Sequence, residues 1–185
     1  MPAKITGLDH NHETGQTRDL MNPEKPEKKF LTPESQSGHR ALRRGRVSMP
    51  RHAYLVTSVT IGRTPFFLDF PAGCAAARCF EDGVLLDDAR MLAWVLMPDH
   101  AHWLIQLGEK RSLSMIVSRI KSASARMANR SLKRQGPLWD RAFYDHALRA
   151  DEDLRQSARY VIANPIRAGL VKRAGDYPFW NAVWV

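Results

Sequence analysis

Two apolar runs close together in the middle of the chain constrain its fold more than any other feature. The runs are ARMLAWVLM, residues 89–97, and AHWLIQL, residues 101–107, and Pro-Asp-His stands between them. Apolar runs of this length that are bounded by turn residues are typical of buried strands. A connection as short as Pro98 and Asp99 can join two such strands only in antiparallel pairing. The sequence therefore predicts an antiparallel hairpin.

The segments on either side of this hairpin complete a mixed pattern of strands and helices. We expect two further strands, over AYLVTSVT (residues 53–60) and RAFYDHAL (residues 141–148). We expect helices over residues 70–83, ended by Gly83, over residues 113–134, capped by Ser112, and from Asp151 to Asn164, where Pro165 stops the helix. This order predicts an α+β fold with a ferredoxin-like split βαβ antiparallel sheet and an added C-terminal helix that carries a tyrosine.

Composition separates an N-terminal segment from one folded domain. Residues 1–50 are rich in Pro, Gly, Glu, Lys, Asn and Thr and show almost no aliphatic periodicity. Because such a segment cannot bury enough apolar surface to fold alone, we expect a disordered basic tail there and one folded domain over residues 51–185. The alternative for the tail is an arm that follows a DNA backbone, formed by Arg40, Arg43, Arg44 and Arg46.

The charge balance indicates the class of partner. The chain has 28 Lys and Arg against 19 Asp and Glu, a formal net charge of +9. Such an excess of cations favours polyanions, with nucleic acid as the first candidate and a membrane surface as the second. No apolar run approaches the roughly 18 residues of a membrane-spanning helix, and the N-terminus has no apolar signal core. We therefore expect a soluble, cytoplasmic, nucleoid-associated protein without a membrane partner.

Two histidines open the second strand of the hairpin, in the triplet His100-Ala101-His102. Residues two apart on a strand point to the same face, so both imidazoles project together while Ala101 points the other way. Such a pair can bind one divalent ion, but ordinary hydrogen-bonded histidines remain the alternative until a third ligand is found. Nearby candidates are Asp99, which we expect to form the turn and face away, and His146 on the last strand.

A tyrosine and an asparagine stand one helical turn apart in RYVIANP. Tyr160 and Asn164 lie on the same side of the expected helix, because residues four apart are stacked. That side flanks the apolar stripe of Leu154, Ala158 and Val161, so neither residue is forced into the core. One interpretation is a phenol and an amide oxygen delivered as a unit. The plainer alternative is a tyrosine that packs at the rim and an asparagine that ends the helix.

Three stretches together resemble the REP-associated tyrosine transposases, relatives of the IS200-like HUH single-strand transposases. The stretches are MPDHAHWLIQL, PLWDRAFYDHALRADEDL and ARYVIANPIRAGLV, and the similarity covers about residues 53–177 in the same order. The resemblance implies that Tyr160 is the nucleophile. It also implies a metal site made by His100, His102 and Asn164. The fold that it implies is a ferredoxin-like antiparallel sheet, which agrees with the order of elements above.

The same resemblance implies the chemistry and the partners. Tyr160 would attack a phosphodiester of single-stranded DNA at REP-like hairpins, leaving a 5′-phosphotyrosine and a free 3′-hydroxyl. The implied cofactor is Mg²⁺ or Mn²⁺, although the histidines alone would equally accept Zn²⁺ or Ni²⁺. We expect a monomer, with a dimer as the alternative. Tyr144 is the rival nucleophile, but it lies on a strand and has no amide partner at helical spacing.

Basic residues of the middle helix are the candidate DNA contacts. No Asp or Glu occurs between Arg111 and Arg134. The cations fall beside the expected apolar face, which consists of Leu113, Ile116, Val117, Ile120 and Met127. A solvated helix face is the alternative interpretation. The residues that we predict to contact DNA are Arg119, Lys121, Arg126, Arg130, Lys133, Arg134 and, beyond the last helix, Arg167.

Two other classes of function remain open beside a transposase and single-strand endonuclease. The first is a DNA-binding protein of the same ancestry that has lost cleavage and acts as a repressor or structural factor. The intact set of His100, His102, Tyr160 and Asn164 argues against it. The second is a metal hydrolase that attacks with a bound water, which would not need Tyr160.

Overall fold

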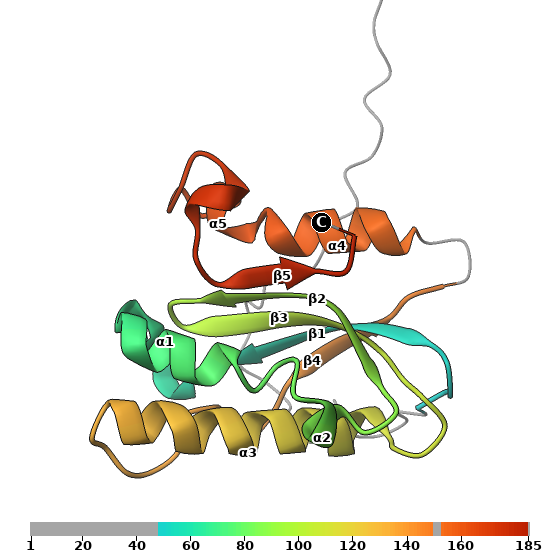
Figure 1. Cartoon of the computed structure of the whole chain (residues 1–185), viewed down its shortest axis with the longest axis horizontal. Helices are drawn as coiled ribbons and strands as arrows, with labels where there is room; N and C mark the ends of the chain where they lie inside the picture. Colours follow the sequence, from blue (N-terminus) through green and yellow to red (C-terminus); the bar gives the residue numbers. More distant parts are fainter. Residues whose placement is uncertain (1–47, 150–152, 185) are drawn as a thin grey trace, which may run out of the picture. The chain divides into compact units, whose positions relative to one another are not determined.

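One antiparallel sheet organises the protein, as a computed structural model shows for residues 48–149 and 153–184 (Figure 1). These residues all belong to a compact unit formed by residues 38–185. The strands are β1 (Ala53–Val59), β2 (Arg90–Met97), β3 (His100–Gln106), β4 (Tyr144–Ala147) and β5 (Trp180–Ala182). The helices are α1 (Phe70–Ala77), α2 (Gly83–Leu86), α3 (Leu113–Ser131), α4 (Leu154–Ile162) and α5 (Asn164–Arg167), with 3-10 turns η2 (Ile61–Arg63), η3 (Phe66–Leu68) and η4 (Ala174–Asp176).

The order of the strands confirms the predicted fold class. The sheet runs β4-β1-β3-β2-β5, and every neighbouring pair is antiparallel. In β4-β1-β3-β2, the crossover through α1 joins β1 to β2 and the crossover through α3 joins β3 to β4, which is the split βαβ arrangement. The predicted hairpin is β2 and β3: Met97 pairs with His100 across the turn formed by Pro98 and Asp99.

The fifth strand is missing from the prediction. Its three residues are too few to show the alternation from which a strand can be recognised. Trp180 pairs with Val95, and the N–H of Leu96 donates to the carbonyl of Phe179 at 2.9 Å. Because β5 covers the edge of β2, β2 is an interior strand, which explains why all of its residues after Arg90 are buried.

Helices cover both faces of the sheet (Figure 1). The side chains of β3 alternate between these two faces. Its odd-numbered residues point into the main core with α1 and α3. Trp103 is completely buried there, with its ring 5.2 Å from that of Phe80 and 5.9 Å from that of Trp139. Its even-numbered residues, His100 and His102 among them, point to the other face, which α4 covers.

Helix α3 spans 19 residues and follows the predicted amphipathic pattern with one exception. Ser112 caps it as predicted, because its hydroxyl accepts the N–H of Met115 at 3.4 Å. Met127 is 41% exposed, contrary to the prediction, because the buried stripe rotates toward Ala128 in the last turns. The helix ends three residues early, before Lys133, whose φ of 51° is left-handed. No helix in the described ranges is both long and apolar enough to span a bilayer.

The helix predicted over residues 70–83 is two helices. Helix α1 ends at Ala77, and Gly83 opens α2 instead of ending α1. The cause is Asp82, whose carboxylate accepts the N–H groups of Val84 at 2.8 Å and Leu85 at 3.4 Å. An Asp in this position caps the start of a new helix, so the chain turns before Gly83.

The last predicted helix also ends differently. Helix α4 begins at Leu154 under a cap from Asp153, while the predicted start at residues 151–152 lies outside the described residues. It ends at Ile162, two residues before the predicted end. Asn164 instead opens α5, with Pro165 in the first turn, where the missing N–H costs no helical hydrogen bond.

Residues 48–50, which precede the predicted start of the domain, contact the folded elements. The Oγ of Ser48 accepts the N–H of Leu113 at 3.0 Å, and the N–H of Met49 donates to the hydroxyl of Tyr54 at 2.8 Å. These contacts tie residues 48–50 to α3 and β1. The predicted tail, with its possible arginine arm, otherwise lies outside the described residues.

Candidate active site

The histidine pair lies at the start of β3 with its two rings close together. His100 and His102 point to the same face, and their ring centroids lie 4.9 Å apart at an interplanar angle of 87°. The Nδ1 of His100 lies 2.6 Å from the Asp99 carboxylate, and the Nδ1 of His102 lies 2.8 Å from the Oγ1 of Thr57. Both Nδ1 atoms are therefore anchored. The Nε2 atom of each ring is the remaining nitrogen through which the pair could bind an ion.

The contact between Asp99 and His100 corrects the expectation that Asp99 faces away. A turn residue is not bound by the alternation of a strand, and the short Asp99 side chain reaches back to the neighbouring ring. An ionised carboxylate can only accept hydrogen bonds, so the neutral His100 ring carries its proton on Nδ1 and keeps a lone pair on Nε2. A carboxylate behind a histidine is the arrangement found around metal-bound imidazoles.

A second residue holds Asp99 in place. The Nη1 of Arg63 lies 3.2 Å from the Asp99 carboxylate. Burial by itself raises the pKa of Asp99, but the hydrogen bonds and charges of His100 and Arg63 outweigh it and lower the pKa below its ordinary value. Asp99 is therefore ionised at neutral pH and remains an acceptor for His100.

The surroundings of His102 keep its ring neutral. Burial is the main cause that lowers the pKa of His102 to about 3, and the positive charges of Arg167, of Arg63 and of His100 in its protonated form lower it further. A neutral imidazole offers a lone pair to an electrophile at physiological pH. The charge effects also show that Arg167 from α5 and Arg63 from η2 both lie within electrostatic range of this ring.

Tyr160, Asn164 and Arg167 form one hydrogen-bonded group at the junction of α4 and α5. The Nδ2 of Asn164 donates to the carbonyls of Tyr160 at 3.2 Å and Val161 at 2.8 Å. Arg167 donates to the Oδ1 of Asn164 at 2.7 Å and to the carbonyl of Tyr160 at 3.0 Å. Its guanidinium carbon lies 3.9 Å from the centre of the Tyr160 ring. The amide thus bonds the backbone of Tyr160, and Arg167 contacts both the phenol ring and the amide oxygen.

The histidine pair and the tyrosine group belong to the same side of the sheet. Helix α4 packs mainly on β2, β3 and β5 (Figure 1). This is the face toward which His102 and Leu104 point. Val161 on α4 and Pro165 on α5 are buried, which turns the junction toward the sheet. The fold therefore brings the predicted nucleophile and the predicted metal ligands to one face.

The residues present fit the chemistry of a divalent metal. Two neutral imidazoles with anchored Nδ1 atoms and one amide oxygen are donors that such ions accept. Within the described ranges, no group of three or more His, Cys, Asp or Glu side chains is arranged to hold a metal ion. A metal site would therefore need the amide of Asn164, as predicted, and the metal-binding role of these residues stays a prediction.

The two other candidates on β4 lie on the same face but further away. Tyr144 pairs with Thr57 and His146 pairs with Leu55, so both side chains point to the histidine side. β4 is separated from β3 by β1. This position places His146 two strands from the histidine pair and does not support it as a third ligand.

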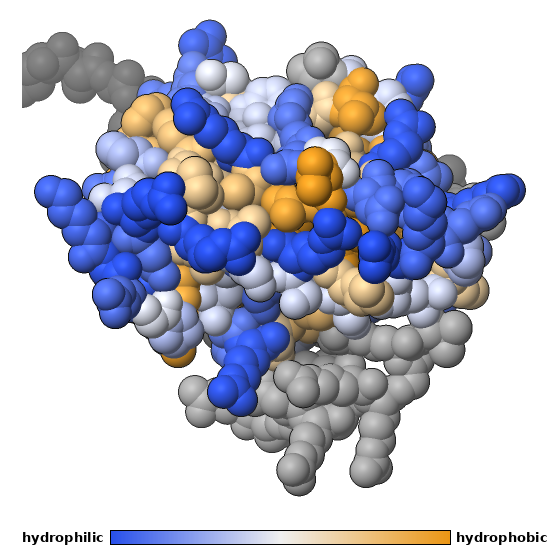
Figure 2. All heavy atoms as spheres, turned by 60° about the horizontal axis from the view of Figure 1, so that its bottom comes forward, coloured by the Kyte–Doolittle hydropathy of each residue, from blue (hydrophilic) through white to orange (hydrophobic). Residues whose placement is uncertain are grey.

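The basic residues of α3 lie on the opposite face from the histidines. Figure 2 shows this side of the molecule, where hydrophilic side chains border hydrophobic patches. Arg119 donates to the carbonyl of Val84 at 2.5 Å. Arg134 donates to Asn129 at 2.7 Å and covers the ring of Phe66 at 4.4 Å. The exposed residues of the predicted stripe are Arg126, Arg130 and Lys133. Their DNA contacts stay a prediction, and the fold does not bring them to the histidine face.

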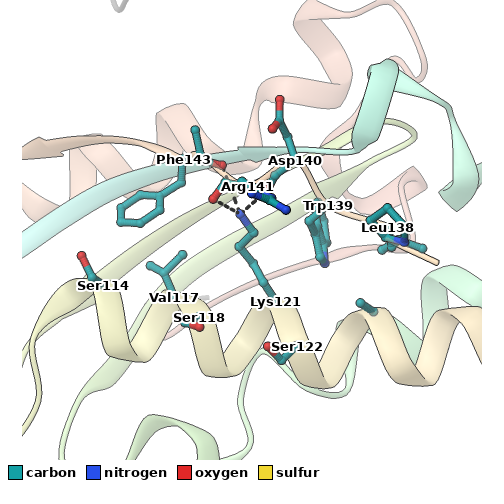
Figure 3. A pocket seen from close by; sticks show the side chains of 13 residues that line it. Ser114, Val117, Ser118, Lys121, Ser122, Leu138, Trp139, Asp140, Arg141 and Phe143 are labelled. Atoms are coloured by element: carbon teal, nitrogen blue, oxygen red, sulfur yellow. Dashed lines mark hydrogen bonds between the residues drawn. The ribbon is translucent and has the colours of Figure 1, made fainter. Parts of the chain in front are cut away.

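Lys121 supports a loop. Its ammonium donates to the carbonyls of Asp140 at 2.6 Å, Ala142 at 3.1 Å and Arg141 at 3.3 Å, as Figure 3 shows. These contacts close one side of an open groove of about 590 Å³ between α3 and residues 137–143. The groove lies on the α3 side of the sheet. We interpret Lys121 as a structural residue of this loop.

Thr57 and Arg63 are the supporting residues that sequence reasoning missed. Thr57 contacts His102 because the two residues are register partners on β1 and β3. Pairing register between strands so distant in sequence has no local signal, so the contact could not be read from the residues. Arg63 reaches Asp99 from a 3-10 turn that was not predicted.

Comparisons with known proteins point to one family. Residues 75–163 match the family described as Transposase IS200 like. The REP-associated tyrosine transposase of Escherichia coli K12 is 33% identical over 89 residues, which are 47% of this chain and 50% of that protein. A Haemophilus influenzae protein with a provisional assignment to the same group is 30% identical over 98 residues, 48% of this chain and 56% of its own. The chain thus spans about half the length of the curated relatives it matches.

A solved structure shares the fold. It is that of a REP-associated tyrosine transposase bound to a REP hairpin, and it aligns with a TM-score of 0.58 at 23% identity. The alignment covers 78% of this chain and 81% of the other. The shared architecture supports the antiparallel sheet and covering helices described above.

Proposed function

Because residues 75–163 match the family described as Transposase IS200 like, we propose that the chain is a member of this family and that it cleaves and rejoins single-stranded DNA through Tyr160. The observation that carries the proposal is the common position of the two motifs. His100 and His102 point to the face of the sheet that α4 covers, and α4 carries Tyr160. A relative of the same fold is bound to a REP hairpin, so we propose a single strand with such a hairpin as the substrate.

The proposed step is a transfer of a phosphodiester to the phenol. The Oη of Tyr160 attacks the phosphorus, a new O–P bond forms, and the bond from phosphorus to the 3′ oxygen breaks. The products are a 5′-phosphotyrosine and a 3′-hydroxyl. One proton leaves the phenol and one is taken up by the departing oxygen, so the protons balance. The reverse attack by a 3′-hydroxyl rejoins a strand, because the phosphodiester linkage is conserved in the intermediate.

The other residues hold and orient the reacting groups. Arg167 covers the ring of Tyr160 and donates a hydrogen bond to the amide oxygen of Asn164. These contacts limit the movement of the phenol relative to the amide. Asp99 and Thr57 fix the two imidazole rings. A divalent ion such as Mg²⁺ or Mn²⁺, held by His100, His102 and Asn164, would stabilise charge that develops on the phosphate oxygens.

The proposal is tested by covalent capture of the DNA. Wild-type protein, Tyr160→Phe and the matched control Tyr144→Phe are incubated with Mg²⁺ or Mn²⁺ and a labelled single strand that carries a REP-like hairpin. We expect a denaturant-resistant adduct with the wild type and with Tyr144→Phe, and none with Tyr160→Phe. Peptide mapping of the adduct to Tyr144 would contradict the assignment of the nucleophile.

The same assay separates the competing functions. Cleavage that persists in Tyr160→Phe without an adduct would indicate a hydrolase that uses water. Tight binding of the hairpin without cleavage by the wild type, with either metal, would indicate a DNA-binding protein that has lost its activity. Both outcomes would overturn the proposed reaction.

A further inference from the structure

Among the described residues, helix α4 covers one half of the histidine face of the sheet, and the other half is more exposed near its edge strand. Helix α4 makes its main contacts with β2, β3 and β5. On the other half, formed by β1 and β4, Leu55 is buried, whereas Tyr144 is 36% exposed and His146 is also exposed. Thr57 and Val59 of β1 are half-buried. These four residues, Thr57, Val59, Tyr144 and His146, define a surface that we call the β1–β4 shelf.

The register of the sheet connects this shelf to the histidine pair. Tyr144 pairs with Thr57, and Thr57 pairs with His102, so the three side chains form one row across the sheet. The hydrogen bond of 2.8 Å between Thr57 and His102 confirms that they point to the same face. Two strand spacings separate Tyr144 from His102, roughly 10 Å at the backbone. The aromatic ring therefore lies about one nucleotide's reach from the proposed reaction centre.

Cations stand at both sides of the reaction centre. Arg63 projects from the turn that follows β1, and its side chain is 48% exposed although it contacts Asp99. Arg167 projects from α5, beside Tyr160. A phosphate chain that passes the histidines from either side would meet a guanidinium, which is a preferred partner of phosphate oxygens. The charge around the end of the shelf is thus complementary to a nucleic acid backbone.

We propose that the β1–β4 shelf binds the single strand next to the cleaved phosphate, with a base stacked on the ring of Tyr144. The proposal rests on the proposed function, because it assumes a single-stranded DNA substrate. An unpaired base exposes its π-face to an aromatic side chain, whereas bases inside a duplex are stacked on each other. This role explains an exposed aromatic side chain on an edge strand, in the same row of the sheet as His102.

A protein partner fits this surface less well. A stable interface buries about 800 Å² on each side and has an apolar centre. Among the described residues of the shelf, Tyr144 is the large hydrophobic residue with substantial exposure, and its neighbours are Thr57 and His146. One aromatic ring among polar groups, with guanidinium groups nearby, suits a base and its phosphate.

The test measures binding separately from cleavage. In a Tyr160→Phe background, the affinity for a single-stranded hairpin oligonucleotide is compared for Tyr144, Tyr144→Phe and Tyr144→Leu by fluorescence anisotropy. Phe keeps the stacking ring, and Leu keeps an apolar side chain without it. We expect Tyr144→Phe to bind within about twofold of the parent and Tyr144→Leu to bind about fivefold to a hundredfold more weakly. A 2-aminopurine placed beside the cleavage site should lose its quenching in Tyr144→Leu.

Several outcomes would overturn the proposal. Equal affinity and equal quenching with Tyr144→Leu would show that no base stacks there. If Tyr144→Leu lost binding to a fully paired duplex of the same sequence to the same degree, the shelf would not select single strands. If Tyr144→Leu instead lost binding to an apolar peptide library and kept its binding to DNA, the shelf would bind a protein partner. A failure of the proposed cleavage is detected separately, as the absence of an adduct with the wild-type protein. The affinity comparison of the Tyr144 variants does not depend on cleavage and still tests the shelf.

Discussion

Replacement of Asp99 by Asn tests the least expected contact of the candidate site. The carboxylate holds the Nδ1 of His100 at 2.6 Å and fixes the proton there, which leaves Nε2 free to bind an ion. Asn has nearly the same volume, but it carries no charge, and its amide can present either an oxygen or an NH₂ group to the ring. We therefore expect Asp99→Asn to keep the fold and to weaken metal binding.

The size of the effect follows from the geometry. A hydrogen bond to a charged group contributes about 1.5–3 kcal/mol, and the partly exposed side chains, 24% for Asp99 and 21% for His100, favour the lower part of this range. Loss of a supporting partner of a metal-bound histidine typically lowers affinity about tenfold to a hundredfold. We expect the Kd for Mn²⁺ to rise about tenfold in Asp99→Asn and more in Asp99→Ala, which also removes the oxygen.

The assay is calorimetric titration of the protein with Mn²⁺ at neutral pH, followed by adduct formation with a single-stranded hairpin. A matched control is Asp87→Asn, because the side chain of Asp87 is also 24% exposed and is also bound by an arginine, Arg111 at 3.0 Å, at the C-terminal end of α2. The control should bind Mn²⁺ as the wild type does. Wild-type affinity in Asp99→Asn, together with loss of binding in His100→Ala, would refute the supporting role of the carboxylate.

Two further predictions concern stability. Burial raises the pKa of Tyr177 to about 12, and its hydroxyl donates to the carbonyl of Leu96 at 2.8 Å. Because the phenol ionises more easily in the unfolded chain, the unfolding free energy should fall as the pH rises from about 10 to about 12. The loss should be at most roughly 3 kcal/mol. The difference in unfolding free energy between wild type and Tyr177→Phe, measured by urea denaturation, should shrink or reverse across this window, and a constant difference would contradict the argument. Lys121→Met should lower the unfolding free energy by about 1–3 kcal/mol, since three carbonyls lose a charged donor. The exposed Arg126→Met, on the same helix, should change it by less than about 0.5 kcal/mol, and equal effects of the two would show that the loop contacts are not stabilising.

The parts of the fold that the sequence predicts are those with a strong local pattern. The hairpin of β2 and β3 is recognisable because both strands are buried on two sides and read as continuous apolar runs. The short strand β5 has no such pattern, and its place beside β2 depends on contacts far along the chain. The prediction that Gly83 ends a helix was wrong. Asp82 caps the start of a new helix there, and this cap outweighs the tendency of glycine to end a helix.

The same distinction applies to the supporting residues of the site. The triplet of His100 and His102 specifies that two imidazoles share a face, since this follows from the geometry of one strand. Which groups hold the Nδ1 atoms depends on the turn and on the register of β1, and neither follows from residue types. Sequence thus predicts the reactive groups, while the orientation of their lone pairs comes from tertiary structure.

The positions of Tyr160 and Asn164 show that helical spacing predicts their common side even across the junction of two helices. Asn164 begins a new helix, yet it keeps its place below Tyr160 because Ala163 remains in the right-handed helical region, with φ −81° and ψ −4°. The side-chain amide then donates to two backbone carbonyls of the preceding turn, while Arg167 donates to its oxygen. These three contacts admit one orientation of the amide, with its NH₂ group toward the helix and its oxygen outward. An amide oxygen has two lone pairs, so the contact with Arg167 leaves one lone pair of Asn164 for the metal ion that we propose. Because the guanidinium holds the amide oxygen, it also fixes the direction of this remaining lone pair.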